Sequence, residues 1–313
     1  MTMKASAIST TDRTLPFSVR ALRLWFAVES RVSPRTAEDR AARIFATPPR
    51  HTKASKTKIK TRALSSSADA TRTEIAVRDT AGEVVATAIG HGPTVMFLHG
   101  WGGSTMDMSP LANAFATAGY RSILFDMPGH GRAARRESSL VEFLKTIRSV
   151  AGALGPPDLI IGHSLGGAAA VFAVTELELP VRGAVLVSPA PGPAYYVNRF
   201  VRAVGLPHAR TEGMIRQLVQ RVGRSLESLD AVVAARDATV PALVFHDPAD
   251  REVPFEFATR MSEAWRKSRL VPTPSLGHKR ILRDPATIAA AIEFADSLIG
   301  ASSRTQRGMT LGA

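Results

Sequence analysis

The stretch Leu159-Ile160-Ile161-Gly162-His163-Ser164-Leu165-Gly166-Gly167-Ala168-Ala169 carries the strongest structural signal in this chain of 313 residues. A short apolar run ends in Gly-x-Ser-x-Gly, and small apolar residues follow it. This order predicts a buried strand, a tight turn and a helix packed on all sides. The turn crowds the backbone, so glycines without a Cβ are expected on both sides of the serine. The spacing is typical of a turn that presents a nucleophilic serine. The alternative is a tight turn that only begins a small-residue helix.

A second glycine-rich turn, His99-Gly100-Trp101-Gly102-Gly103, directly follows another apolar run. Such a turn lets the backbone approach a ligand closely, with its N–H groups facing inward. Acyl transfer needs two donors of this kind where the negative oxygen develops. The backbone N–H groups of Trp101 and Leu165 are therefore the candidates for an oxyanion hole. The alternative is an ordinary strand-to-helix turn.

Two carboxylates and a histidine follow the last two expected strands. Asp247 and Asp250 come after the strand near 243–246, and His278 comes after the strand near 270–273. Both aspartates have a structural alternative, since Asp is frequent in turns and helix caps. The chain order of Ser164, an aspartate and His278 is that of nucleophile, acid and histidine in one class of hydrolase.

These segments, taken together, resemble the α/β-hydrolase superfamily over roughly residues 72–300. The resemblance also uses Asp126-Met127-Pro128-Gly129-His130-Gly131, after which relatives usually carry a serine where this chain has Ala133. It favours Asp250 over Asp247 as the acid of a catalytic triad with Ser164 and His278. Asp126 is expected to hold its own loop instead.

The expected fold class is α/β, with a mostly parallel eight-stranded sheet covered by helices on both faces. A helical lid insertion and a basic N-terminal helical extension complete this expectation. The expected domains are an extension at 1–72, hydrolase core at 73–188 and 239–300, a lid at 189–238, and a disordered tail at 301–313.

About fifty residues interrupt the alternation of strands and helices before the strand near 243–246. Helical periodicity predicts helices near 195–204, 214–222 and 226–235, and relatives carry a lid at this position. The candidate substrate-binding residues are His163, Tyr195, Tyr196, Phe200 and Met214. The alternative for the lid residues is that they only pack the lid onto the body.

The net charge of +13 is uneven, because residues 1–72 hold 15 of the 40 Lys and Arg but only 5 of the 27 Asp and Glu. The pattern of apolar and basic residues over 15–32 predicts a basic amphipathic helix. A second helix is expected over 34–45 and a basic linker over 53–62. This extension has three interpretations. It packs on the hydrolase body, it contacts an anionic membrane surface as a peripheral helix, or it is a targeting peptide.

Composition excludes several classes of function. The chain has no cysteine, so disulfides and thiol chemistry are excluded and a reducing, cytoplasmic location is expected. No metal-ligand spacing or dinucleotide fingerprint is present, so neither a metal nor a cofactor is expected. Aromatic residues make up only 6% and do not alternate with basic ones, which disfavours nucleic-acid binding.

The resemblance implies a serine hydrolase that cleaves carboxylic esters or related small-molecule acyl compounds through an acyl-enzyme intermediate. A histidine side chain titrates near neutral pH and can take the proton of Ser164. The serine at the nucleophile position disfavours epoxide hydrolases and haloalkane dehalogenases, which carry aspartate there. Two alternatives stay open: an acyltransferase or cofactor-free peroxidase-like enzyme with the same triad, and a non-catalytic binding protein.

Overall fold

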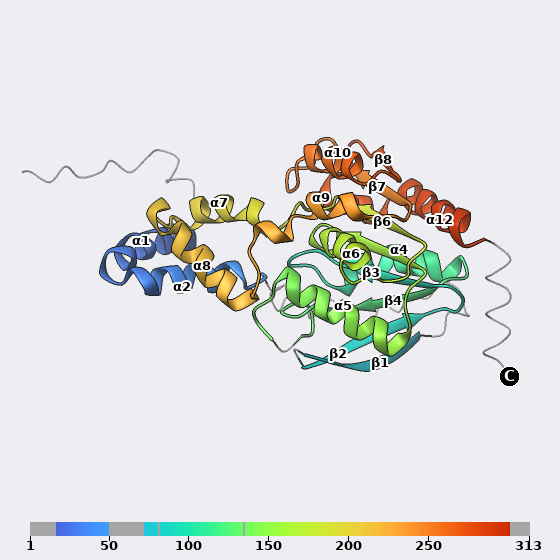
Figure 1. The fold of residues 1–313 in the computed structure, drawn as a ribbon, viewed down its shortest axis with the longest axis horizontal. Coiled ribbons are helices and arrows are strands. Elements are labelled where there is room, and N and C mark those ends of the chain that lie inside the picture. The colour runs from blue at the N-terminus through green and yellow to red at the C-terminus, as the bar shows by residue number, and fades with distance from the viewer. Residues whose placement is uncertain (1–16, 50–71, 81, 134, 301–313) are drawn as a thin grey trace, which may run out of the picture. The chain divides into compact units, whose positions relative to one another are not determined.

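The computed structural model describes residues 17–49, 72–80, 82–133 and 135–300 (Figure 1). These residues fall into two compact units. The helical unit comprises residues 17–46 and Pro193–Leu226, and the sheet unit comprises the described residues of 47–192 and 227–300. The expected linker at 53–62 and the expected disordered tail at 301–313 lie outside the described residues.

The sheet unit is built on one eight-stranded sheet in the order β1-β2-β4-β3-β5-β6-β7-β8. Strand β2 runs antiparallel to both β1 and β4, and all the other neighbouring pairs are parallel. The predicted mostly parallel sheet is therefore confirmed. The strands are β1 (Arg72–Asp79), β2 (Gly82–Ile89), β3 (Thr94–Leu98), β4 (Arg121–Phe125), β5 (Leu159–His163), β6 (Gly183–Val187), β7 (Ala242–His246) and β8 (Ser268–Pro272).

Helices cover both faces of this sheet (Figure 1). Strands β5, β6 and β7 are buried at every residue, which is why they are apolar throughout rather than alternating. Their odd-numbered residues, such as Ile161 and Phe245, share a core with α4 and α12, and α5, α6, α9 and α10 form the other layer. The helices are α4 (Thr105–Thr117), α5 (Leu140–Leu154), α6 (Leu165–Thr175), α9 (Ala231–Ala234), α10 (Phe255–Ala264), α11 (Gly277–Arg280) and α12 (Pro285–Ile299).

One expected helix, over 226–235, is broken in the structure. A 3-10 turn at Glu227–Leu229 precedes α9, and a second 3-10 turn follows at Ala235–Asp237. The cause is Asp230, whose carboxylate accepts the N–H groups of Val232 and Val233 and thereby starts a new helix. In a continuous helix the N–H groups of Val232 and Val233 would donate to backbone carbonyls, so Asp230 could not cap them.

The helical unit consists of α1 (Phe17–Val32), α2 (Pro34–Phe45), α7 (Pro193–Val204) and α8 (Thr211–Val222). The N-terminal helices and the inserted helices share one hydrophobic cluster, although residues 47–192 separate them in sequence. Its buried members are Phe26, Ala37, Ala41, Ala42, Val197, Val201, Val204, Leu206, Met214, Leu218 and Leu226. Short amphipathic helices need such mutual burial, because isolated ones are marginal in water.

Four of the candidate substrate-binding residues lie in this unit. Met214 is fully buried in the hydrophobic cluster, so it is a core residue and does not line an open pocket. Phe200 packs against the same cluster and meets Phe45 edge to face, with ring centroids 5.3 Å apart. Tyr195 and Tyr196 are half-buried and pack edge to face on each other.

Candidate active site

Ser164 occupies the turn between β5 and α6. Its backbone has φ 54° and ψ −119°, a strained conformation for a residue with a side chain. The backbone N–H of Ser164 donates to the carbonyl of Val187 (3.0 Å), and its carbonyl accepts the N–H of Ala190 (3.0 Å). These bonds to the end of β6 hold the strained turn in place. Its side chain is half-buried and has no hydrogen bond within the described part of the chain.

The glycines of the turn are required by close backbone contacts. A Cβ at Gly162 would lie 2.2 Å from the carbonyl oxygen of Gly166, and one at Gly166 would lie 2.3 Å from that of Leu98. Neither oxygen can move, because both belong to packed secondary structure. The Gly-x-Ser-x-Gly spacing therefore follows from how tightly α6 folds back onto β5 and β3.

The glycine-rich turn after β3 runs directly beside the serine. A Cβ at Gly100 would lie only 2.8 Å from the Cβ of Ser164. His99 holds this turn, since its Nδ1–H donates to the Gly100 carbonyl (2.8 Å) and its Nε2 accepts the Met127 N–H (3.0 Å). The N–H groups of Trp101 and Leu165 have no hydrogen-bond partner among the described residues. Both donors are thus available to a ligand.

Asp126 accounts for the neighbouring loop. Its carboxylate accepts the N–H of Thr105 (2.8 Å), at the start of α4, and the N–H of Arg132 (3.0 Å). A Cβ at Gly131 would overlap this carboxylate at 2.1 Å. Asp126 therefore ties down its own loop.

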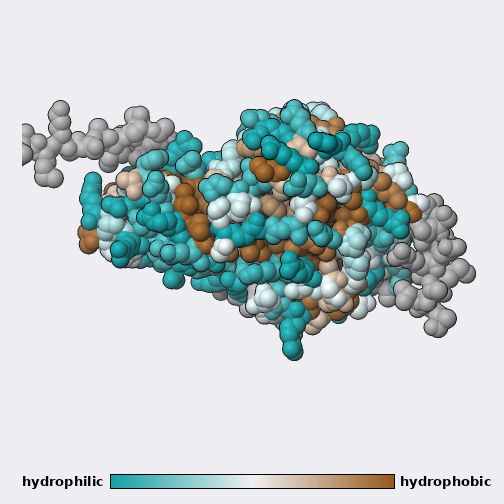
Figure 2. Space-filling view, viewed as in Figure 1, coloured by the Kyte–Doolittle hydropathy of each residue, from teal (hydrophilic) through white to brown (hydrophobic). Residues whose placement is uncertain are grey.

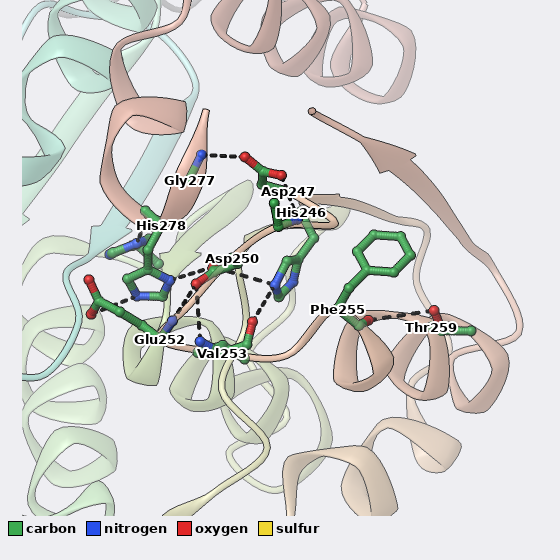
Figure 3. A network of polar contacts seen from close by, with 11 residues as sticks. His246, Asp247, Asp250, Glu252, Val253, Phe255, Thr259, Gly277 and His278 are labelled. Atoms are coloured by element: carbon green, nitrogen blue, oxygen red, sulfur yellow. Dashed lines mark hydrogen bonds and ion pairs between the residues drawn. The ribbon is translucent and has the colours of Figure 1, made fainter. Parts of the chain in front are cut away.

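His278 and Asp250 meet through a direct hydrogen bond (Figure 3). The Nδ1 of His278, in the one-turn helix α11, lies 2.7 Å from Oδ2 of Asp250 in the loop after β7. The other carboxylate oxygen accepts the N–H groups of Glu252 (2.8 Å) and Val253 (3.1 Å). The carboxylate is fully buried and its orientation is fixed.

A second histidine flanks the same carboxylate. His246, fully buried at the end of β7, lies with its Nε2 3.4 Å from Asp250 Oδ2 and donates to the Val253 carbonyl (2.9 Å). Burial alone would raise the pKa of Asp250. Hydrogen bonds from His246, His278 and the Glu252 N–H outweigh burial, so the pKa lies below its ordinary value. Asp250 is therefore a stable carboxylate at neutral pH.

Asp247, the competing carboxylate, is placed differently. It accepts the N–H of Ala249 (2.7 Å) and that of Gly277, the residue before His278. Its burial raises the pKa, but backbone N–H donors at Gly277, Ala249, Leu276 and Ser275 lower it more, so the net pKa falls. Asp247 thus fixes the turn that carries His278, whereas Asp250 bonds the imidazole.

His163 links this histidine to the serine turn. Its Nε2–H donates to the backbone carbonyl of His278 (2.8 Å), and the two imidazole rings lie 4.6 Å apart. Burial, and secondly the nearby His278, lower the pKa of His163 to about 3, so the ring is neutral. His163 was a candidate for substrate binding. The structure buries it and bonds it to the backbone of His278, directly before Ser164 in the chain.

The Nε2 of His278 faces away from Asp250. Its nearest charged group is the carboxylate of Glu252, 3.8 Å away and largely exposed (Figure 3). Within the described part of the chain, no hydrogen bond joins this nitrogen to Ser164. The nitrogen that would accept a proton is therefore available.

Two further histidines beside the glycine-rich turn are neutral as well. Burial lowers the pKa of His99, and burial together with the neighbouring His99 lowers the pKa of His130 to about 4. The His130 ring packs edge to face on Trp101 at 5.1 Å. These rings support the turn. No group of described residues could hold a metal ion.

The sequence singled out His163 for substrate binding and Asp247 as the competing acid, but not for the contacts that they make here. His163 lies inside the Gly-x-Ser-x-Gly motif, and Asp247 lies in the same loop as Asp250. His246 was missed, because it is a single residue at the end of an apolar strand and no motif marks it. The bonds of Asp247 to the distant turn at 275–277 could not be predicted from local sequence.

Comparisons with known proteins give the family of this chain and its fold. The model of the Alpha/beta hydrolase family matches residues 95–291. The pimeloyl-[acyl-carrier protein] methyl ester esterase of Stenotrophomonas maltophilia is 29% identical over 223 residues, or 66% of this chain and 82% of that protein. Its namesake in Xanthomonas oryzae pv. oryzae is 36% identical over 121 residues, 39% of this chain, and the match spans less than half (44%) of that relative's length.

Solved structures extend the likeness of fold. An esterase of Pyrococcus furiosus superposes with a TM-score of 0.61 at 17% identity, covering 82% of this chain and 98% of that one. At this identity the likeness concerns the fold alone.

Proposed function

Because this chain belongs to the alpha/beta hydrolase family, we propose that it is a serine hydrolase that cleaves carboxylic esters or related acyl compounds through a covalent acyl-enzyme. The observation that carries the proposal is the hydrogen bond of 2.7 Å between His278 and Asp250. The turn that carries His278 is hydrogen-bonded through its backbone to His163, the residue directly before Ser164. An acid, a histidine and a serine in this arrangement match the requirements for activating a hydroxyl.

The tautomer of His278 determines its role. Asp250 is a carboxylate that can only accept, so Nδ1 carries the proton and Nε2 keeps its lone pair. In the proposed mechanism, Nε2 takes the proton of Ser164 as Oγ attacks the acyl carbon. It then donates this proton to the leaving alcohol. Asp250 stabilises the imidazolium that forms in between.

The developing oxyanion requires two donors. The N–H groups of Trp101 and Leu165 flank Ser164, and both lack partners among the described residues. The N-terminus of α6 adds the positive end of its helix dipole. Losing one such donor typically costs about 10²–10³ in kcat, so a displaced glycine-rich turn would impair turnover strongly. Water activated by the same histidine then releases the acid.

Esters are the most direct substrate class for this proposal. Two relatives are named as methyl ester esterases acting on an acyl group carried by a protein. We transfer only the ester linkage to this chain, because the match to the Xanthomonas relative spans only 44% of that relative's length. The expected partner is a small-molecule acyl compound.

A series of p-nitrophenyl esters of increasing acyl length tests the proposal. The wild-type protein should show a burst of one nitrophenolate per enzyme, followed by slower turnover. Ser164→Ala should abolish both phases, and His278→Ala should lower kcat by about 10⁴ or more. His208→Ala, at a histidine in the helical unit, is the matched control and should retain activity. Turnover by Ser164→Ala equal to that of wild type would refute the proposal.

A further inference from the structure

Helix α1 has an apolar face that the other described residues of its unit do not cover. Leu24, Trp25, Val28 and Val32 are 69%, 55%, 60% and 79% exposed, respectively. They are four of the six large apolar side chains exposed among the described residues. At helical spacing they lie on one side of α1, while Phe26 on the other side is fully buried in the hydrophobic cluster. Helix α1 is therefore apolar on two sides and packed on only one.

Basic side chains flank this face along both edges. Arg20 and Arg31 lie along one edge by helical spacing, and both are exposed. On the other edge the guanidinium of Arg40 stacks over the Trp25 ring at 5.0 Å. Exposed Arg35 follows at the start of α2. The apolar face thus has a positively charged border.

Among the charges that border this face, the acids of α1 and α2 offset only that of Arg40. Glu29 pairs with Arg40 (3.0 Å), and Asp39 pairs with Arg43 (3.0 Å) and Arg221. Buried Glu38 lies 3.7 Å from Arg210 of the same unit. By contrast, Arg20, Arg31 and Arg35 have no ion pair within the described part of the chain. The free charge on these two helices is therefore basic.

We propose that this face, defined by Leu24, Trp25, Val28 and Val32 with Arg20 and Arg31, docks onto the surface of an anionic lipid bilayer. The apolar side chains enter the boundary between headgroups and acyl chains, where tryptophan is favoured. The arginines contact the anionic headgroups, each contributing about fivefold to partitioning at low salt. The surface is independent of the proposed ester chemistry. An acidic protein would match only the positive charge of this face. A second copy of this chain would match only its apolar area.

Co-sedimentation of the full-length protein with vesicles tests the proposal. One set contains phosphatidylcholine alone, and the other also contains phosphatidylglycerol. Wild type should bind the anionic vesicles at least about tenfold more tightly than the neutral ones, and added salt should weaken this binding. Trp25 should show a blue-shifted emission on binding that Trp25→Phe removes.

Two double variants separate the contributions of the face. Leu24→Ser with Val28→Ser should weaken binding to anionic vesicles by about tenfold or more, because both apolar groups lose their burial. Met106→Ser with Val233→Ser removes the other exposed apolar pair and should leave binding unchanged. Arg20→Gln with Arg31→Gln should weaken binding to anionic vesicles only, and it replaces no packed side chain, so it stays informative if the first variant misfolds.

Several outcomes would overturn the proposal. The wild-type protein would fail to sediment with anionic vesicles. Alternatively, the Leu24/Val28 and Arg20/Arg31 variants would both bind these vesicles as tightly as wild type does. An equal loss in the Met106/Val233 control would have the same effect. A wild-type dimer that dissociates in the Leu24/Val28 variant, without vesicle binding, would assign the face to a second copy instead. Ester hydrolysis measured without vesicles is expected to be the same in all these variants.

Discussion

Asp247 and Asp250 lie in the same loop after β7, yet their carboxylates have different partners. Asp250 receives the His278 imidazole, while Asp247 receives the backbone N–H of Gly277. Local sequence does not distinguish them, because both aspartates follow an apolar strand and both suit a turn, and only the family resemblance favoured Asp250. The difference lies in contacts with a segment about thirty residues further along the chain.

The pair makes a direct prediction. Asp250→Asn should lower kcat by about 10³–10⁴ with little change in KM, because the wrong imidazole tautomer becomes favoured. Asp247→Asn should mainly destabilise the protein, by about 1–3 kcal/mol, as buried N–H groups lose a charged acceptor. Steady-state kinetics and urea unfolding of both variants measure the two effects. A larger loss of kcat in Asp247→Asn than in Asp250→Asn would contradict these roles.

His130 makes the stability of the protein depend on pH. Burial, and secondly His99, lower its pKa in the folded state to about 4, whereas an unfolded histidine titrates near about 6.5. Between these values the unfolded chain binds more protons. The free energy of unfolding must therefore fall as the pH drops through this window.

The variant His130→Asn tests this dependence on pH. In the wild type, His130 Nδ1 donates to the Pro128 carbonyl at 2.9 Å, and the amide of asparagine can still donate to the same carbonyl. The variant should remove about 2 kcal/mol of the difference in unfolding free energy between about pH 7.5 and about pH 5. Urea unfolding at both pH values provides the measurement. Exposed His91→Asn is the control and should leave the difference unchanged. An unchanged difference in His130→Asn would show that His130 does not cause it.

At the scale of elements, the site depends on how closely three segments approach: the glycine-rich turn, the serine turn and α11. Strands β3 and β5 and helix α6 could be predicted from continuous apolar runs, since buried parallel strands are apolar throughout. The one-turn helix α11 could not, because its four residues, Gly277-His278-Lys279-Arg280, show no periodicity. The break at Asp230 was missed for a related reason, since an aspartate inside a helical pattern is seen as a cap only once its partners are known.

A glycine pair tests this close approach. Gly100→Ala should lower kcat/KM by about 10²-fold, since its Cβ would press on the Ser164 Cβ and displace the glycine-rich turn. Gly152→Ala is the matched control, because that position lies in α5 and a Cβ there meets nothing within 4 Å. The control should raise the free energy of unfolding by about 0.5–1 kcal/mol and keep full activity. Normal kinetics in Gly100→Ala would contradict the described contact.

At the scale of the whole molecule, the sequence predicted two separate appendages on a hydrolase body, and the structure joins their helices into one unit. Amphipathic patterns showed that α1, α2, α7 and α8 each have an apolar face. They could not show which face packs on which, since any apolar face suits any other. The residues 227–238, expected in the lid, belong to the sheet unit instead. The fold of the hydrolase body was predictable because its motifs carry both spacing and order.

Met214 tests the shared core of the helical unit. Met214→Ala should destabilise this unit by about 2–5 kcal/mol, because a fully buried side chain is replaced by a cavity. Hydrogen–deuterium exchange should then accelerate in α1 and α2 as well as in α8. The control Met106→Ala, at a side chain 59% exposed, should leave exchange unchanged. Acceleration confined to α8 would contradict a common core.

If Ser164 is a nucleophile activated by His278, it must react covalently with an electrophile that mimics an acyl group. The folded full-length protein is incubated with a fluorophosphonate probe and its intact mass is recorded. We expect one adduct, located on Ser164 by peptide mapping, much slower labelling of His278→Ala and none of Ser164→Ala. Folded wild-type protein that stays unlabelled, or an adduct that persists in Ser164→Ala, would contradict this role of Ser164.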